Sequence, residues 1–126
     1  MISADFATIA GTEAARGTAG GRSVVADRPA GVAGGGGLGF NGGELLALAL
    51  GGCLCNDLRY AAHEHGVDLE PFELRVELEV EDGRVLGARI VADGGPDLRR
   101  LLDGAVERST IVAALVDGAP VTVEAA

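Results

Sequence analysis

Cys53, Cys55, His63 and His65 are the residues of this chain that offer the widest range of chemistry. A thiolate is a nucleophile, and cysteine together with histidine can bind zinc. On one helix, however, residues two positions apart point about 200° apart around the axis. Neither pair can then hold one ion, and the two cysteines cannot form a disulfide with each other. We therefore expect no metal and separate roles for the two thiols, and a zinc site shared between chains is the remaining alternative.

The stretch Gly34–Gly39 reads GGGGLG and satisfies the dinucleotide fingerprint G-x-G-x-x-G. That fingerprint acts between a strand and a helix, and a parallel strand must follow the helix. Here an irregular segment precedes the glycines and an amphipathic hairpin follows. We therefore expect a loop from Gly31 to Gly43, and no nucleotide or other cofactor.

The cysteines belong to a segment with clear helix-start and helix-stop signals. Asn41 can act as N-cap with Glu44 three residues later, which predicts a capping box. At the other end, histidines suit the carbonyl end of the helix dipole and Gly66 suits the left-handed residue after the helix. Because apolar residues occur nearly all round the helix between residues 45 and 54, we expect its first half to be buried on every side.

A β-hairpin is predicted after this helix. Large apolar residues alternate with charged ones from Phe72 to Val80, Asp82-Gly83 then supplies a type I′ turn, and alternation resumes from Leu86 to Ile90. The first forty residues predict two short strands, separated by turn residues at Gly17–Gly21.

Two helices and a strand are predicted after the hairpin. Pro96 opens a helix with one apolar stripe, and a shorter helix spans Ser109–Val116. A last strand is predicted at Val121–Glu124. This order does not repeat βαβ units, so we predict an α+β fold in a single domain, residues 1–126. The stripe of the first of these helices consists of Leu98, Leu101, Leu102, Ala105 and Val106.

Composition excludes several classes of function. The 126 residues are 48% hydrophobic, and 10 basic against 19 acidic residues give a net charge of −9. Such a chain does not attract nucleic acid or an anionic membrane surface. All basic residues are arginines, so chemistry that needs a lysine ammonium is excluded. We also expect a cytoplasmic protein, because the first residues lack a targeting pattern and the cysteine pair is not a disulfide framework.

The stretch Gly39–Cys53 resembles the central-helix signature of the OsmC/Ohr family, the osmotically inducible and organic hydroperoxide resistance proteins, which runs G-x-N-P-x-E-L-L-L-A-A-L-G-G-C. Thr18–Arg22 is similar to the early T-x-G-G-R turn of that family. The resemblance implies an intertwined homodimer in which an antiparallel sheet wraps a long buried central helix, with thiol sites at the subunit interface.

The resemblance also implies peroxide chemistry. Cys53 would attack a small organic hydroperoxide and become a sulfenic acid, Arg22 would stabilise its thiolate, and a glutamate would orient that arginine. Glu44 is the candidate for this glutamate. It lies one residue later than the acid of the hydroperoxide-resistance branch, so helix capping is its alternative role.

Two residues depart from the family pattern. Ser109 aligns with the second, resolving cysteine, so no intramolecular disulfide can form there and an external thiol must act as reductant. Asp57, one turn beyond Cys53, would raise the pKa of that thiol if the carboxylate is unpaired, and so oppose Arg22. Two alternatives stay open: a non-catalytic homodimer that binds a small apolar ligand at its interface, and a variant in which Cys55 is the working thiol.

Overall fold

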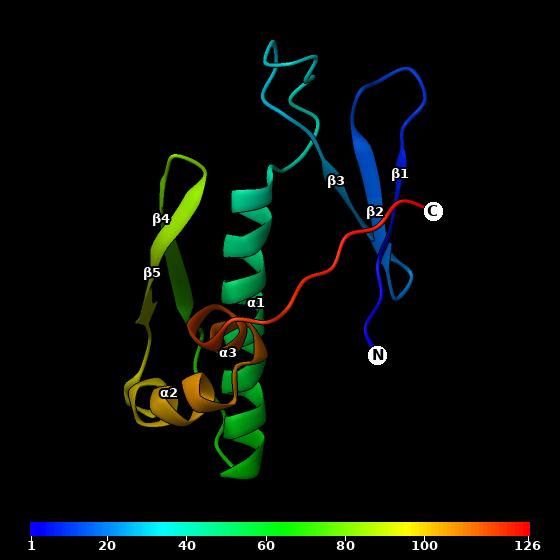
Figure 1. Ribbon diagram of the computed structural model, residues 1–126. Helices are drawn as coiled ribbons and strands as arrows, with labels where there is room; N and C mark the ends of the chain where they lie inside the picture. The colour runs from blue at the N-terminus through cyan, green and yellow to red at the C-terminus, as the bar shows by residue number, and fades with distance from the viewer. The chain divides into compact units, whose positions relative to one another are not determined.

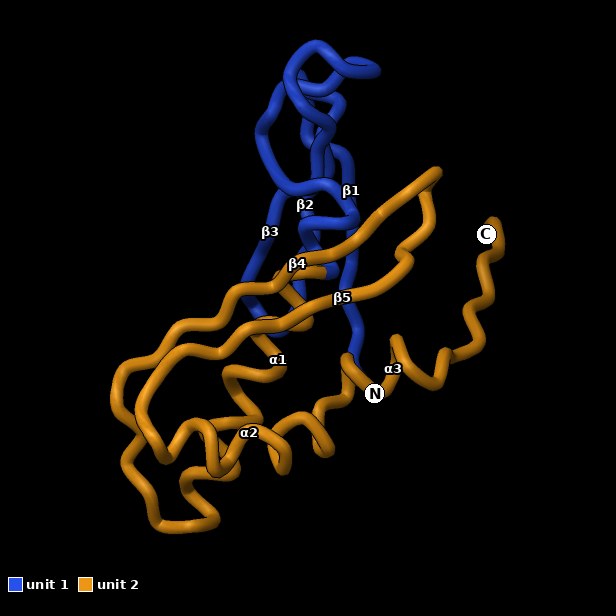
Figure 2. Tube along the Cα trace, turned by 90° about the vertical axis from the view of Figure 1, so that its left-hand side faces the viewer, with its two compact units in different colours: residues 1–46 blue, residues 47–126 orange.

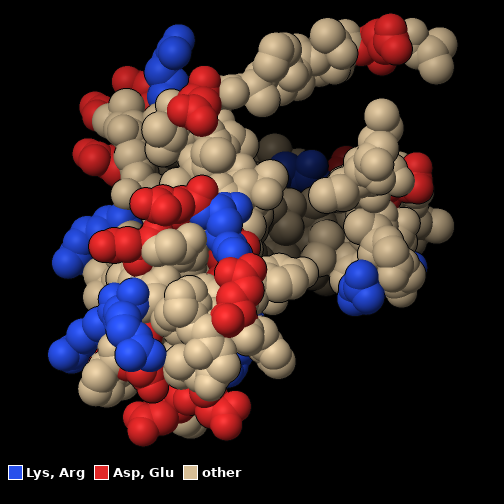
Figure 3. Space-filling model, turned by 90° about the horizontal axis from the view of Figure 1, so that it is seen from below, with Lys and Arg blue, Asp and Glu red and all other residues tan.

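The computed structural model describes residues 1–126, which divide into two compact units, residues 1–46 and 47–126 (Figure 2). The structure is α+β, as predicted, with two antiparallel sheets rather than the one sheet expected. On the face in Figure 3, arginine and acidic side chains lie interspersed. The single domain stays a prediction.

The N-terminal unit contains a three-stranded antiparallel sheet in the order β1-β2-β3, with β1 at Asp5–Thr8, β2 at Ala15–Ala19 and β3 at Arg22–Ala26 (Figure 1). The prediction of two strands was wrong. Strand β2 lacks large apolar residues and contains Gly17, for which the sequence predicts a turn. Gly17 pairs with Phe6 of β1, and a Cβ there would come within 2.5 Å of the Phe6 ring. The ring therefore takes the place of a side chain on β2.

The turn between β2 and β3 consists of Gly20 and Gly21. Both residues have positive φ, at 55° and 78°. Only glycine adopts this conformation without strain. The predicted T-x-G-G-R segment is thus a two-residue hairpin turn, and Arg22 is the first residue of β3.

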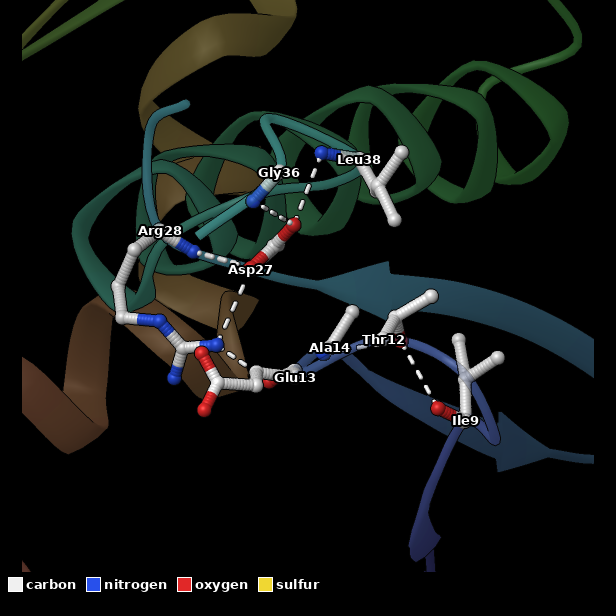
Figure 4. A network of polar contacts seen from close by, with 8 residues as sticks. All are labelled: Ile9, Thr12, Glu13, Ala14, Asp27, Arg28, Gly36 and Leu38. Carbon is white, nitrogen blue, oxygen red and sulfur yellow. Dashed lines mark hydrogen bonds and ion pairs between the residues drawn. The ribbon is translucent and has the colours of Figure 1, made fainter. Parts of the chain in front are cut away.

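The glycine-rich loop is held closed by the buried side chain of Asp27 (Figure 4). Its Oδ2 accepts hydrogen bonds from the backbone N–H groups of Gly36 and Leu38, each at 3.0 Å, and its Oδ1 accepts one from the N–H of Arg28 at 2.8 Å. These bonds, led by that of Leu38, hold the pKa of Asp27 below its ordinary value. Two N–H groups of the GGGGLG stretch therefore already bind the protein's own carboxylate.

Helix α1 spans Gly42–Glu64, and both of its ends form as predicted. The N–H of Glu44 donates to Oδ1 of Asn41 at 2.8 Å, and the N–H of Asn41 donates to Oε1 of Glu44 at 3.1 Å, which confirms the capping box. After the helix, Gly66 has a φ of +64°, and the N–H of Val67 donates to the carbonyl of Ala62 at 2.9 Å.

Within the single chain, the first half of α1 is not buried on every side as predicted. Leu48 is 53% exposed, whereas the buried residues begin at Leu50 and concentrate in the second half. The reason is tertiary: the core cluster joins the second half of α1 to the next helix and to the hairpin. The buried positions of α1 are Leu50, Leu54, Asp57, Leu58, Ala61 and Ala62.

The predicted hairpin is confirmed in the C-terminal unit. Strand β4 spans Glu73–Glu81 and pairs antiparallel with β5, Arg84–Asp93. Asp82 and Gly83 have φ values of 49° and 73°, as a type I′ turn requires. The register shifts by a bulge between Glu79 and Val80.

Helix α2 spans Pro96–Arg108 and buries the predicted stripe at Leu98, Leu101 and Ala105, while Val106 stays 38% exposed. Helix α3 spans Thr110–Asp117, one residue later than predicted, because Ser109 is its N-cap.

The strand predicted at Val121–Glu124 is absent. This segment is extended and unpaired (Figure 1). Val123 is 93% exposed. A strand needs a partner for its backbone groups, and none lies beside these residues in the described unit.

Candidate functional site

The sulfur of Cys53 lies between two buried polar side chains of the C-terminal unit. Its thiol donates a hydrogen bond to Oδ2 of Asp57 at 3.4 Å, and it accepts one from the hydroxyl of Ser109 at 3.4 Å. Asp57 is 8% exposed and Ser109 only 1%, whereas Cys53 is half-buried. The sulfur is thus fixed by one acceptor and one donor while part of the residue remains accessible.

Local structure explains why these three side chains meet. Asp57 follows Cys53 by four residues on α1, so both lie on the same helix face. Ser109 stands at the junction of α2 and α3, where its Oγ accepts the N–H of Val112 at 3.4 Å. Because the cap uses the oxygen as an acceptor, the hydroxyl proton is free to face the sulfur.

Ser109, which the resemblance aligns with the resolving cysteine, therefore contacts the Cys53 sulfur. The sequence identified Asp57 and Ser109 as departures from a pattern. It did not show that both contact the same sulfur atom. That contact depends on the packing of the α2–α3 junction against α1.

An ion pair that the sequence does not predict lies next to this cluster. Nη2 of Arg108, the last residue of α2, lies 2.7 Å from each carboxylate oxygen of Glu64 on α1. The hydrogen bond to Glu64 raises the pKa of Arg108, and the charges of Glu64, Asp57 and Tyr60 act in the same direction. The signal available was a basic residue in the last turn of a helix, directly before Ser109.

Cys55 has a different environment from Cys53. It is also a free, half-buried thiol, but no hydrogen bond to its sulfur is present. Burial raises the pKa of the Cys55 thiol, against a smaller opposite effect of Arg59. The Arg59 guanidinium lies 5.1 Å from the ring centre of Phe72. Burial therefore disfavours the thiolate, which is the reactive form of Cys55.

The structure describes Arg22 and Glu44 within the N-terminal unit and Cys53 within the C-terminal unit. Arg22 is exposed at the start of β3, and Glu44 closes the capping box. Their grouping with Cys53 stays a prediction.

Neither predicted histidine is part of the thiol cluster. His63 is exposed, and Nδ1 of His65 lies 2.9 Å from the carbonyl oxygen of Ala61. The structure contains no cluster of three or more His, Cys, Asp or Glu side chains with a geometry for a metal ion.

An apolar cavity of about 310 Å³ opens near the thiol cluster within the same unit. Leu50 lines it from α1, three residues before Cys53, and Val112 lines it from α3. The backbone N–H of Val112 also binds Ser109, so one residue links the cavity wall to the polar cluster. The remaining lining residues are Val85, Leu86, Gly87, Ala88, Ile90, Leu115 and Val116.

No helix of the structure combines the length and the apolar character needed to cross a membrane.

Fold and site together define an α+β protein that holds a hydrogen-bonded thiol on a long helix. Residues 34–124 match the family model described as OsmC-like protein. Because this match covers well over half of the chain, the protein belongs to the OsmC-like family, and the predicted resemblance is confirmed. No curated protein matches the sequence.

Solved structures agree on the fold at low sequence identity. An OsmC-like protein from Mycoplasma pneumoniae matches with a TM-score of 0.74 at 11% identity, over 92% of this chain and 87% of its own. A putative osmotic stress induced and detoxification response protein from Psychrobacter arcticus matches with a TM-score of 0.71 at 16% identity, over 90% of this chain and 88% of its own. An organic hydroperoxide resistance protein OsmC from Legionella pneumophila matches with a TM-score of 0.60 at 17% identity, over 91% of this chain and 88% of its own.

Proposed function

We propose that this protein is a thiol-dependent hydroperoxide reductase in which Cys53 is the peroxidatic nucleophile. The observation that carries the proposal is the polar setting of the Cys53 sulfur, with an acceptor at Asp57 and a donor at Ser109, each at 3.4 Å. An inert packed cysteine has no need for such partners, because free cysteine normally behaves as a small apolar residue. Membership of the OsmC-like family supports the same chemistry.

The proposed site also includes Arg22 and Glu44. A guanidinium near the sulfur stabilises the thiolate, and arginine is the one permanently cationic residue type in this chain. In the proposed active protein, Arg22 supplies that charge and Glu44 orients it. This arrangement belongs to a homodimer, which is supported by large apolar side chains that the single chain leaves exposed, among them Leu48, Val121 and Val123.

The catalytic cycle needs an external thiol. Thiolate attack on the hydroperoxide forms a sulfur–oxygen bond, breaks the oxygen–oxygen bond and yields a sulfenic acid and an alcohol. Ser109 cannot resolve the sulfenic acid as a disulfide, so a small thiol must do so, and a second small thiol then regenerates Cys53. A reducing, cytoplasmic compartment supplies such thiols. The apolar cavity supports an organic rather than an inorganic peroxide as substrate.

Thiol counting with cumene hydroperoxide tests the proposal. One equivalent should consume one thiol per chain and give a sulfenic acid at Cys53 that dimedone traps, as located by peptide mass spectrometry. Cys53→Ser should abolish the reaction. The matched variant Cys55→Ser should retain it, because Cys55 has no hydrogen-bonded partner. An inert Cys53 in the wild-type protein contradicts the proposal.

The cavity favours one second candidate, a non-catalytic protein that binds a small apolar ligand. Its walls are built almost entirely of aliphatic side chains. Native mass spectrometry of the purified protein tests this candidate, which requires a small molecule that stays bound. Rapid hydroperoxide turnover with a small thiol excludes it.

A further inference from the structure

We infer that Asp57 is a catalytic residue of the Cys53 site, which takes the thiol proton as the sulfur attacks and delivers it to the alkoxide that leaves. The inference rests on the proposed function. Its geometric basis is the contact of Oδ2 of Asp57 with the Cys53 sulfur at 3.4 Å, from a carboxylate that is 8% exposed.

Packing does not account for an acid at this position. Asp57 stands beside Leu58 and one turn from Leu54 and Ala61, all in the apolar core cluster. Burying a carboxylate is unfavourable unless it is paired and hydrogen-bonded. The positive charge of Arg108, on α2, attracts the Asp57 carboxylate, but the Arg108 guanidinium is hydrogen-bonded to Glu64 and not to Asp57. The Cys53 thiol is thus the one side-chain donor that Asp57 has, and the carboxylate retains free capacity to take a proton.

The step balances with one shared proton. The proton of Cys53 moves to Asp57, and the thiolate attacks the terminal oxygen of the hydroperoxide, which becomes the hydroxyl of the sulfenic acid. The sulfur loses two electrons and the peroxide gains them. The alkoxide released by oxygen–oxygen cleavage takes the proton from Asp57, which returns to a carboxylate. The products are one sulfenic acid and one alcohol.

Ser109 complements Asp57 on the same sulfur. Asp57 accepts the thiol proton, and Ser109 donates to the sulfur, where negative charge develops. The cap to Val112 holds the Ser109 oxygen in place, so the donor needs no reorganisation when the thiolate forms. Asp57 therefore accepts the proton that leaves the sulfur, and Ser109 stabilises the negative charge that remains on it.

Two reagents separate proton delivery from thiolate formation. Iodoacetamide and cumene hydroperoxide both need the Cys53 thiolate, but iodide leaves without a proton and an alkoxide needs one. The rate constant for hydroperoxide divided by that for iodoacetamide, both measured at one neutral pH, is therefore independent of the thiolate fraction. In Asp57→Asn, measured in a Cys55→Ser background, we expect this ratio to fall at least about tenfold, in line with general acid catalysis. The exposed Asp103→Asn on α2 is the matched control, with an unchanged ratio.

A measurement on the unsubstituted Asp57 keeps the inference testable if Asp57→Asn does not fold. As pH rises and the pair loses its shared proton, alkylation should increase to a plateau while the ratio falls. The other charged or titratable groups around the pair are Arg108 of α2, its partner Glu64, and Tyr60 on α1. A ratio independent of pH, or unchanged in Asp57→Asn, overturns the role of Asp57 while hydroperoxide reduction stands. A Cys53 that alkylates but never reacts with hydroperoxide overturns the proposed function itself.

Discussion

Two buried aspartates, one in each unit, show how differently the same side chain can be used. Asp27 is 7% exposed and Asp57 is 8% exposed. Asp27 accepts three backbone N–H groups and a guanidinium N–H from Arg28 at 3.1 Å. Asp57 accepts one hydrogen bond, from the Cys53 thiol. The first carboxylate is fully engaged by fixed donors, and the second faces a group that can itself lose a proton.

The comparison separates structural from chemical use of a buried charge. A carboxylate saturated by backbone donors is held in its charged form and orders a loop. A carboxylate that faces one thiol keeps lone pairs available for proton transfer. The two aspartates therefore predict opposite phenotypes, in stability for Asp27 and in reactivity for Asp57.

The largest expected effect is a change of product at the Cys53 site. Ser109→Cys places a second sulfur where the hydroxyl lies 3.4 Å from the Cys53 sulfur, close enough for a bond of about 2 Å after a small rotation. One equivalent of hydroperoxide should then give an intramolecular disulfide, and dimedone trapping at Cys53 should fall more than about tenfold. Intact mass before and after alkylation measures both products. Persistent sulfenic acid at wild-type yield contradicts the geometry of the cluster.

Substitution at Asp27 should reverse the pattern expected at Asp57. Asp27→Asn turns one acceptor oxygen into an amide that cannot accept from the N–H groups it faces, so buried donors lose their partner. We expect the Tm to fall by about 5 °C while alkylation of Cys53 keeps its rate. Thermal unfolding by circular dichroism and iodoacetamide kinetics measure the two effects. Loss of Cys53 reactivity at unchanged Tm breaks the comparison.

The pH dependence of stability provides a smaller effect from the same pair. The pKa of Asp27 lies below its ordinary value of 3.8, so its charged form stabilises the folded state above that value. This contribution should stay constant from neutral pH to about pH 4 and be lost as the pH falls through the lowered pKa. The difference in stability between wild type and Asp27→Asn should shrink over this acid range in denaturant titrations. A difference that shrinks already near pH 6 contradicts the assignment.

Glu44 is intermediate between the two aspartates, because one of its oxygens accepts the N–H of Asn41. Asn41→Ala should lower the free energy of unfolding by about 1 kcal/mol through loss of the cap. Glu44→Gln keeps a capping side chain, so its stability should change by less than about 0.5 kcal/mol. If the Glu44 carboxylate orients Arg22 as we propose, its loss should lower the hydroperoxide rate. Denaturant unfolding and dimedone trapping distinguish the two roles. An unchanged rate in Glu44→Gln assigns the residue to capping alone.

Local signals in the sequence determined the two ends of α1 and the turn of the C-terminal hairpin. Asn41 and Glu44 predicted the start of α1, Gly66 its end and Asp82-Gly83 the hairpin turn, because caps and tight turns depend on residues within a few positions of each other. The helix motif ending at Cys53 was enough to identify the family.

These local signals could not predict how segments far apart in the sequence pack against each other. The Phe6 ring of β1 covers Gly17 of β2, a contact between two strands that neither sequence segment reveals alone. The segment 121–124 has the alternation of a strand but no partner in the described unit. Leu48, in the apolar first half of α1, remains exposed where the core of this chain does not reach.

The candidate site shows the same division. The nucleophile that we propose was predicted from sequence, since Cys53 ends a recognisable helix motif. Its immediate chemistry was decided by tertiary structure, which brings Ser109 from the α2–α3 junction to the sulfur and leaves Asp57 with a thiol as its one side-chain donor. Sequence determines which groups are present and which local turns they favour. Only the folded chain determines which lone pairs remain free, because that depends on every donor that packing brings within reach.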